Sequence, residues 1–414
     1  MDMLFLTTET QPQNVIWYLR GGGVWQVLLA LLIAAVVAFA ATPLVKVLSV
    51  KWGAIDVPRD GRRMHDHPIP RMGGLAIFLG FLVAVLLLVP LDGAKKGMLL
   101  GAVVIVILGV FDDKYALPAR LKFVVQIVAA LIAAFAGNRI TVLSNPFSSN
   151  SVWQLGWLSW PVTVIWIVAV TNAVNLIDGL DGLACGVSTI SSLSMLVIAL
   201  LVTEMDVAVV MAALAGACIG FLPFNFNPAK IFMGDTGATF LGYIMATMSV
   251  QGMFKMYGLI SFVVPFLVLG LPIFDVTFAV FRRIAHGQSP MTPDRGHIHH
   301  RLIDMGFTQK QAVGVLYLVS VILGLSAVVL TVTNASRWVL FLIAVGIAAL
   351  VAWQIFRSHE RSIEKNPVDQ QPKAQPAQKA RAASVLSEEE KAPSVISEEG
   401  KVPSAPPEEE RDDG

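Results

Sequence analysis

The chain has 414 residues, of which 55% are hydrophobic and 14% charged, and its formal net charge at pH 7 is +1. Its mean hydropathy is +0.69. These values exclude an ordinary soluble domain and are typical of a membrane protein that crosses the bilayer several times. No nucleic acid partner is expected.

Eleven apolar stretches are long enough, or nearly so, to cross a bilayer core of ~30 Å, which needs about 20 helical residues. The third is short for a span. We therefore predict an all-α polytopic membrane protein with about 11 transmembrane helices and a catalytic membrane domain over residues 24–356. The stretches are 24–50, 74–91, 97–111, 123–138, 158–174, 183–203, 207–224, 238–254, 258–281, 313–333 and 337–356.

The basic residues of the loops are divided unevenly between the two sides of the membrane. Loops that alternate along the chain, beginning with residues 51–73, carry fourteen Lys and Arg, against six in the other set. Cytoplasmic loops carry the excess of basic residues, so the first set is predicted to be cytoplasmic. Residues 1–23 then form an extracytoplasmic N-terminal segment, and eleven spans place the C-terminus in the cytoplasm.

Residues 357–414 differ from the rest of the chain, because they are rich in Pro, Ala, Ser, Glu and Lys. A near-repeat of ten residues begins at Ser384 and again at Ser394. Such a segment buries too little apolar surface to offset the entropy lost on ordering. We predict a disordered acidic cytoplasmic tail, with docking of a partner as the alternative.

Polar residues recur at every third position between two apolar stretches, as Asn172, Asn175, Asp178 and Asp181. Lipid cannot solvate amides and carboxylates, so these groups must face water, a partner or a ligand. On a helix or tight turn this spacing puts the first three roughly on one side. The row predicts a bound metal ion or polar substrate.

Two further acidic motifs lie at the mouths of predicted spans. Asp112 and Asp113 repel one another unless a cation compensates, so they suit Mg²⁺ binding or base catalysis. A solvated helix cap is the alternative, and Lys122 nearby favours function. Asp235 stands between glycines that free its carboxylate to reach a ligand, with a structural turn as the alternative.

Cationic residues gather in two loops that are predicted to be cytoplasmic. His297, His299 and His300 lie beside Arg295, and these groups suit a nucleotide diphosphate or its sugar. Zinc is an alternative, but no matching Cys or second His pair has metal-site spacing; plain juxtamembrane charge is another. Arg71 lies in a loop that favours anionic partners or merely orients the first hairpin.

Together the motifs favour transfer of a phosphoryl-linked group between a soluble nucleotide and a lipid phosphate, because two anions that meet need metal and cationic screening. A secondary transporter is the alternative from another class. It would usually place ionisable groups near mid-span and show inverted repeats. No such repeat is apparent in residues 1–356, and the ionisable groups cluster at span ends, with Lys46 and Asp275 as the chief exceptions. A third alternative is a scaffold protein whose acidic tail recruits partners, but it would not explain the Asn-Asp row at residues 172–181.

Four motifs, at residues 111–114, 172–183, 232–237 and 297–300, resemble those of the polyprenyl-phosphate N-acetylhexosamine-1-phosphate transferases. They occur along this chain in the order that is typical of that family. The chain is most similar to the bacterial branch that uses UDP-N-acetylglucosamine and undecaprenyl phosphate, rather than phospho-N-acetylmuramoyl-pentapeptide. The sequence of residues 172–178 resembles the corresponding motif of enzymes that start wall teichoic acid or related polymers. One departure is Ala238, where the family commonly has Ser.

The resemblance implies a role for each motif. Asp235 and Asn175 would ligate Mg²⁺, with Mn²⁺ as a substitute. Asp112, with Asp113, would bind or deprotonate the lipid phosphate. Lys122 would steady a phosphate, and catalytic Asp178 would orient the nucleotide and its metal. The residues expected to contact the nucleotide or sugar are Asn172, Asp181, Arg71, Arg295, His297, His299 and His300.

The resemblance also implies the reaction and its place. A lipid phosphate oxygen would attack the β-phosphorus of UDP-N-acetylglucosamine and release UMP, at the cytoplasmic face of a bacterial plasma membrane. The sequence leaves open a single or a double displacement, another UDP-N-acetylhexosamine or the pentapeptide substrate, and the polymer that is fed. Further expectations are a UDP-sugar and undecaprenyl phosphate as partners, and a homodimer.

Overall fold

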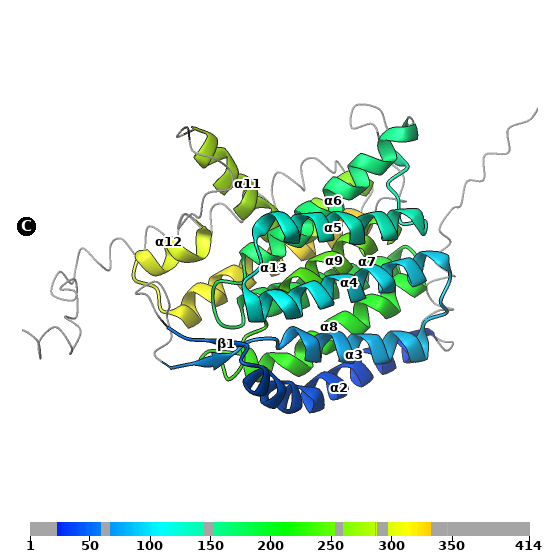
Figure 1. Cartoon of the computed structure of the whole chain (residues 1–414). Helices are drawn as coiled ribbons and strands as arrows, with labels where there is room; N and C mark the ends of the chain where they lie inside the picture. The colour runs from blue at the N-terminus through cyan, green and yellow to red at the C-terminus, as the bar shows by residue number, and fades with distance from the viewer. Residues whose placement is uncertain are drawn as a thin grey trace, which may run out of the picture. The chain divides into compact units, whose positions relative to one another are not determined.

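The computed structural model describes residues 23–58, 67–144, 152–252, 260–285, 287, 297–332 and 346. These residues are almost entirely helical, with two short hairpins (Figure 1). The helices are α2 (Gly23–Trp52), α3 (Gly74–Leu88), α4 (Gly93–Tyr115), α5 (Ala119–Phe135), η1 (Gly156–Leu158), α6 (Ser159–Leu176), α7 (Leu183–Leu201), α8 (Met205–Asn225), α9 (Gly234–Gly252), α10 (Ile260–Val268), α11 (Gly270–Ala285), α12 (Ile298–Asp304) and α13 (Gln309–Val332).

The helix α9 lies at the centre of the bundle, in contact with α3, α4, α6, α7 and α8 (Figure 1). Every residue of α9 is buried except Asp235. Small residues such as Ala238 and Ala246 let the surrounding helices approach closely, as in other membrane bundles. The core of the protein therefore surrounds α9, and its single accessible position is an acidic residue at its first turn.

Six helical segments of the described chain are long and apolar enough to cross a membrane: α2, α4, η1 with α6, α7, α8 and α13. The helix α3 is apolar but has only 15 residues. These findings confirm an all-α membrane protein with several spans. The count of eleven stays a prediction, since the stretch at 337–356 lies almost wholly outside the described residues.

Each of the first ten predicted stretches coincides with helix. The third, which the sequence makes short, is a helix of 23 residues. Asp92 caps its first turn by accepting a hydrogen bond from the Lys95 N–H at 2.8 Å. Ala116, with φ +50°, ends it in the left-handed conformation. Residues outside the apolar run, beginning with the polar cap at Asp92, thus lengthen the helix at both ends.

The ninth predicted stretch, 258–281, is not one helix. It divides into α10, which ends at Val268, and α11, which begins at Gly270. Gly270 has a poor helix propensity, and Pro272 is tolerated only in the first turn of a helix. The stretch is therefore interrupted at Leu269, because these two residues favour a new helix start.

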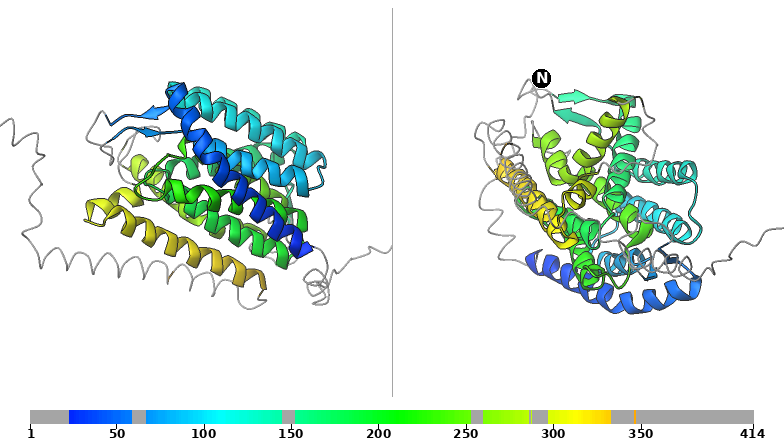
Figure 2. Two further views of the ribbon diagram at one scale, coloured as in Figure 1. Left: turned by 90° about the horizontal axis from the view of Figure 1, so that it is seen from below. Right: turned by 90° about the vertical axis from the view of Figure 1, so that its left-hand side faces the viewer.

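Two antiparallel hairpins join the helices. In the first, β1 (Ile55–Asp56) pairs with β2 (Ile69–Pro70); in the second, β3 (Val142–Ser144) pairs with β4 (Val152–Gln154). The β1–β2 hairpin lies at the same end of the bundle as α12 (Figures 1 and 2). We call this the polar end.

Candidate active site

A lysine bridges two carboxylates at the polar end. Asp112 is in the last turn of α4, Lys122 is in the first turn of α5, and Asp235 is the second residue of α9. The Lys122 Nζ donates to Asp112 Oδ2 at 2.8 Å and to Asp235 Oδ2 at 2.9 Å. The Leu117 N–H donates to Asp112 Oδ1 at 2.7 Å. The two carboxylates therefore face one shared position for a cation.

Asp113 has a different environment from its neighbour Asp112. Its side chain is fully buried and accepts hydrogen bonds from the Asp235 N–H at 2.9 Å, the Thr236 N–H at 3.2 Å and the Thr236 hydroxyl at 2.6 Å. The first N–H groups of a helix have no partner inside it and favour an anion. Asp113 on α4 therefore caps α9 and sets the position of Asp235.

Gly234 is required immediately before Asp235 for two reasons. Its φ of +71° is a conformation that residues with a side chain rarely adopt. A Cβ atom at this position would also lie 2.5 Å from Asp113 Oδ2. The Asp113 carboxylate can cap α9 because residue 234 has no side chain.

Arg71 adds a second cation to this cluster. Its Nε lies 3.6 Å from Asp113 Oδ1, and its Nη2 lies 3.8 Å from Asp235 Oδ1. Burial disfavours the guanidinium charge, but these two carboxylates outweigh it and raise the pKa of Arg71. The chain after Arg71 is held in place because the Gly73 N–H donates to the Phe232 carbonyl at 2.9 Å. The loop that carries Arg71 and the motif at residues 232–237, which are far apart in sequence, are thus neighbours in the fold.

The Asn-Asp row divides among several environments. The helix α6 ends at Leu176, so the row does not form one helical face. Asn172 donates to the Gln126 side chain of α5 at 2.6 Å, within the helix packing. Asn175 is half-buried in the last turn of α6, and Asp178 lies in the turn that follows. Asp178 is the member of the row that is coupled to the carboxylate cluster.

Asp178 is electrostatically coupled to that cluster. Burial, followed by the charge of Asp235, raises the pKa of Asp178 from 3.8 to about 7, and Arg71 opposes the shift. A carboxyl group with a pKa near 7 can exchange a proton near neutral pH, as a general acid or base must.

Two contacts hold the turn between α6 and α7 in place. Asp181 Oδ2 accepts from Asn227 Nδ2 and from the Ala229 N–H, both at 3.0 Å. The Tyr317 hydroxyl of α13 donates to the Gly182 carbonyl at 2.5 Å. Asp181 therefore joins this turn to the connection between α8 and α9.

The three histidines lie at the start of α12. The His297 Nδ1 lies 2.9 Å from Asp275 Oδ2 on α11. The rings of His297 and His299 stack with their centroids 5.7 Å apart, and His300 follows at 4.3 Å from His299. His299 Nε2 lies against Gly179, where a Cβ atom would be 2.3 Å away. The histidines therefore border the turn that carries Asp178.

Comparison with known proteins places this arrangement in a family. The profile of glycosyl transferase family 4 matches residues 96–253, which include the carboxylate–lysine cluster. Over 320 residues the chain is 42% identical to the probable undecaprenyl-phosphate N-acetylglucosaminyl 1-phosphate transferase of Bacillus subtilis (strain 168), covering 77% of this chain and 88% of the relative. The chain belongs to the polyprenyl-phosphate N-acetylhexosamine-1-phosphate transferases.

Two other relatives have similar names. The decaprenyl-phosphate N-acetylglucosaminephosphotransferase of Mycolicibacterium smegmatis is 36% identical over 316 residues, with coverage of 69% of this chain and 78% of the relative. The undecaprenyl-phosphate alpha-N-acetylglucosaminyl 1-phosphate transferase of Yersinia pestis is 29% identical over 328 residues, with coverage of 76% and 89%. This transferase is therefore an enzyme whose relatives use different polyprenyl phosphates.

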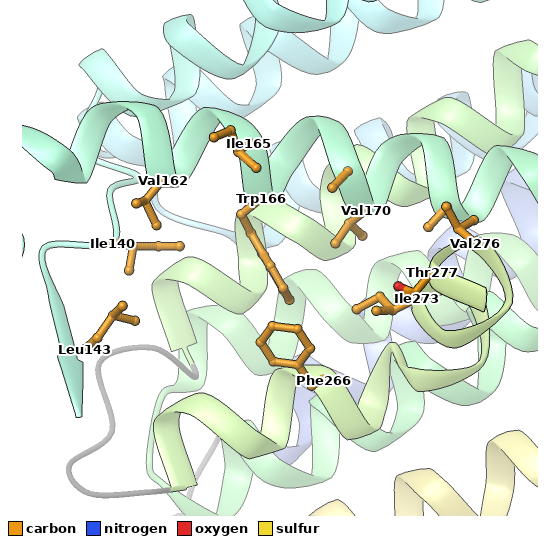
Figure 3. Close-up of a pocket in the computed structure, with 12 residues that line it drawn as sticks. Ile140, Leu143, Val162, Ile165, Trp166, Val170, Phe266, Ile273, Val276 and Thr277 are labelled. Carbon is orange, nitrogen blue, oxygen red and sulfur yellow. The ribbon is translucent and has the colours of Figure 1, made fainter. Parts of the chain in front are cut away.

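An apolar cavity of about 310 Å³ lies between α6, α10 and α11 of this transferase (Figure 3). Trp166 and Phe266 meet in it with ring centroids 5.0 Å apart, and the Trp166 indole N–H donates to Ser249 of α9 at 2.9 Å. The lining is otherwise aliphatic, apart from Thr277. The cavity therefore suits a hydrocarbon chain better than a polar group.

The structure brings together most of the residues that the motifs of this transferase single out. Asn172 and Asp181 lie nearby, but their side chains contact other helices or loops. Arg295 lies outside the described residues. Sequence reasoning noted Asp275 only as an exception, although an acidic residue inside an apolar stretch is itself a signal of function. Those near the site are Arg71, Asp112, Asp113, Lys122, Asp178, Asp235, His297, His299 and His300, and the Asn175 carbonyl accepts from the Asp178 N–H.

Proposed function

We propose that this transferase moves N-acetylglucosamine-1-phosphate from UDP-N-acetylglucosamine to undecaprenyl phosphate and releases UMP. The observation that carries the proposal is the shared position held by Asp112, Lys122 and Asp235, with Arg71 beside it. It occurs in a chain that is 42% identical to a relative named for undecaprenyl phosphate and N-acetylglucosaminyl 1-phosphate.

The reaction joins two anions, and the cluster is suited to that task. An oxygen of the lipid phosphate forms a new bond to the β-phosphorus, the bond between the α- and β-phosphates breaks, and UMP leaves. Lys122 and Arg71 reduce the repulsion between the phosphates. Asp112 accepts the proton of the lipid phosphate when that group arrives protonated. Asp113 contributes by holding Asp235 in place.

Magnesium fits the oxygen donors of this site. Mg²⁺ is usually bound by one or two carboxylates together with substrate phosphates. Asp235 and Asn175 would hold it against the diphosphate, and Lys122 already shows that a cation is accepted between Asp112 and Asp235. Among the described residues, no three His, Cys, Asp or Glu side chains converge on a metal position. A bound Mg²⁺ would neutralise charge on the diphosphate, and Mn²⁺ would substitute.

The prenyl chain of the acceptor would lie in the apolar cavity between α6 and α11. The prenyl chain already lies in the hydrocarbon of the bilayer, so the cavity would favour it through close van der Waals packing rather than through removal from water. Ala169 lines this cavity, and the variant Ala169→Phe would fill part of it. This variant should raise the KM for undecaprenyl phosphate and leave the KM for the UDP-sugar unchanged. Equal changes in both would contradict the placement.

The orientation in the membrane is part of the proposal. Eleven spans would put the N-terminus outside and the C-terminal tail, residues 357–414, in the cytoplasm of a bacterial cell. Two observations support this: basic residues are in excess in the loops of one side, and the contacts among Arg71, Asp113, Lys122 and Asp235 gather their motifs beside the β1–β2 hairpin at the polar end. The polar end would then face the cytoplasm. The product would start teichoic acid or a related envelope polymer, and the enzyme would act as a homodimer.

The function is tested with the purified enzyme, undecaprenyl phosphate and Mg²⁺. We expect release of UMP from UDP-N-acetylglucosamine, loss of turnover on chelation and recovery when Mg²⁺ is restored. UDP-N-acetylgalactosamine and UDP-N-acetylmuramoyl-pentapeptide in the same assay define the sugar. Absence of UMP with the folded enzyme and the first substrate would overturn the proposal.

A further inference from the structure

Asp275 is a buried carboxylate that the proposed reaction does not use. It lies on α11, and its side chain is 3% exposed. Both of its oxygens have partners: Oδ2 lies 2.9 Å from His297 Nδ1, and Oδ1 accepts from the Ile298 N–H at 2.8 Å. A buried carboxylate is tolerated only when it is paired or hydrogen-bonded. One side chain therefore holds both a histidine ring and the first turn of α12.

The contact with Asp275 determines which nitrogen of His297 carries the proton. A carboxylate accepts, so the His297 Nδ1 donates to it and the Nε2 is left for a contact on the opposite edge of the ring. A carboxylate behind a histidine is a common way to fix both its tautomer and its orientation. The orientation of His297 is thus set from α11.

His297 is connected through His299 to the turn between α6 and α7. The rings of His297 and His299 are nearly parallel, with an interplanar angle of 9°. His299 is buried against Gly179, directly after Asp178. Burial, reinforced by His300, lowers the pKa of His299 to about 4, so its ring is neutral near pH 7 and can lie in this packed position. Contacts therefore run without interruption from α11 to the turn of Asp178.

We propose that Asp275 is a positioning residue for the sugar nucleotide: it holds His297 and the start of α12, and thereby sets His299 against the turn that carries Asp178. This inference rests on the proposed function, together with the contacts of the histidines and Asp178 with the nucleotide and its sugar that the family resemblance implies. It assigns the acceptor lipid no contact with Asp275.

The first test is a comparison of two Michaelis constants in the full-length enzyme. The variant Asp275→Ala should raise the KM for UDP-N-acetylglucosamine by about 10- to 100-fold, by analogy with the loss of the carboxylate behind a metal-binding histidine. The KM for undecaprenyl phosphate should stay within about twofold. The variant Asp275→Asn keeps one acceptor oxygen and should give an intermediate value. Asp304→Asn, an exposed residue of α12, is the matched control and should change neither constant.

A double-mutant cycle separates positioning from general stability. If Asp275 acts through His297, the pair Asp275→Asn with His297→Gln should lose no more affinity than His297→Gln alone. Additive losses, or equal rises in both Michaelis constants, would overturn the inference. Asp275→Asn carries this test if the alanine variant does not fold.

Calorimetric binding of UDP, without turnover, keeps this inference distinguishable from the proposed function. A wild-type enzyme that binds UDP but releases no UMP would overturn the proposed function alone. Weaker UDP binding in the Asp275 variants, with the Asp304→Asn control unchanged, would still support the inference. Unchanged UDP binding in the folded Asp275 variants would overturn it.

Discussion

The two ends of the helix α4 both carry buried charge, and they arrange it in opposite ways. At the polar end the carboxylate of Asp112 is 5% exposed, while the cation Lys122 is 26% exposed. At the other end the cation Lys95 is 5% exposed, and its partners Asp92 and Asp206 are 58% and 49% exposed. One end buries its acids, and the other buries its base.

The difference separates the candidate active site from a structural ion pair. Lys95 is satisfied by two exposed acids at 2.8 and 2.5 Å, and this joins α4 to the start of α8. At the polar end, carboxylates from α4, α9 and the turn after α6 gather around Lys122 and Arg71, so acids outnumber bases within that cluster. A surplus of buried negative charge favours a further cation, and such strained electrostatics are typical of functional sites.

The largest effect is expected when the polar end loses a charge. The variants Asp112→Asn and Asp235→Asn should each lower kcat by about 100- to 1,000-fold, because the groups that stabilise charge in the transition state contribute this much. Asp92→Asn makes the same change at the other end and should leave kcat within about twofold. Release of UMP measures all three. Near-normal turnover in either polar-end variant would remove that residue from the mechanism.

A smaller effect is expected from Gly234→Ala, which disturbs the cap that Asp113 makes on α9. The positive φ and the contact with Asp113 should destabilise the protein by about 1–3 kcal/mol and lower kcat by displacing Asp235. Gly314→Ala on α13 is the control, since a Cβ atom there meets nothing within 4 Å. That change should be neutral or stabilise the helix by up to about 1 kcal/mol. Thermal unfolding in detergent distinguishes the two variants.

The pH dependence should reveal Asp178. If its carboxylate orients the nucleotide and its metal, as the family resemblance implies, it acts in the ionised form, and kcat/KM for the UDP-sugar should rise as the pH passes through about 7. The effect on stability has the opposite sign. Because the folded state holds this proton more tightly than the unfolded state, the free energy of unfolding should fall as the pH rises from 3.8 to about 7. Asp178→Asn should remove both dependences, and a pH profile that this variant leaves unchanged would assign the titration elsewhere.

The smallest effect is expected at the other end of α4. Lys95→Met removes a buried cation and leaves Asp92 and Asp206 free to be hydrated, since both are about half exposed. The loss of stability should therefore be about 1 kcal/mol, with kcat unchanged. A large loss of turnover would show that the two ends are coupled, and would contradict the contrast drawn above.

Sequence patterns predicted the helices well where polarity changes abruptly. The apolar stretches from 24–50 to 313–333 all contain helix, because hydrophobicity alone decides which segments can face lipid. Within 258–281 the helix is interrupted, because Gly270 starts a second helix inside an apolar run. Hydropathy does not detect such a break, since it measures composition and not backbone conformation.

Several assignments within the site depended on contacts that sequence spacing cannot show. Asp112 and Asp113 are adjacent, yet one faces Lys122 and the other caps α9. Asn172 and Asp178 belong to one polar row, yet Asn172 contacts Gln126 within the helix packing. Side chains of neighbouring residues leave the backbone in different directions, so their roles depend on which helix lies opposite.

The sequence by itself determined that this protein is an α-helical membrane enzyme, and its motifs named the family and most of the side chains near the site. Only the tertiary structure decided which of the conspicuous acids reach the shared cation position, and that Asp275 stands behind the histidines. The reason is that hydrophobicity and sequence motifs are properties of the chain itself. Burial, hydrogen bonding and the coupling between charges arise only when α4, α5, α9 and α11 pack together. The opposite characters of the two ends of α4 are therefore a property of the fold.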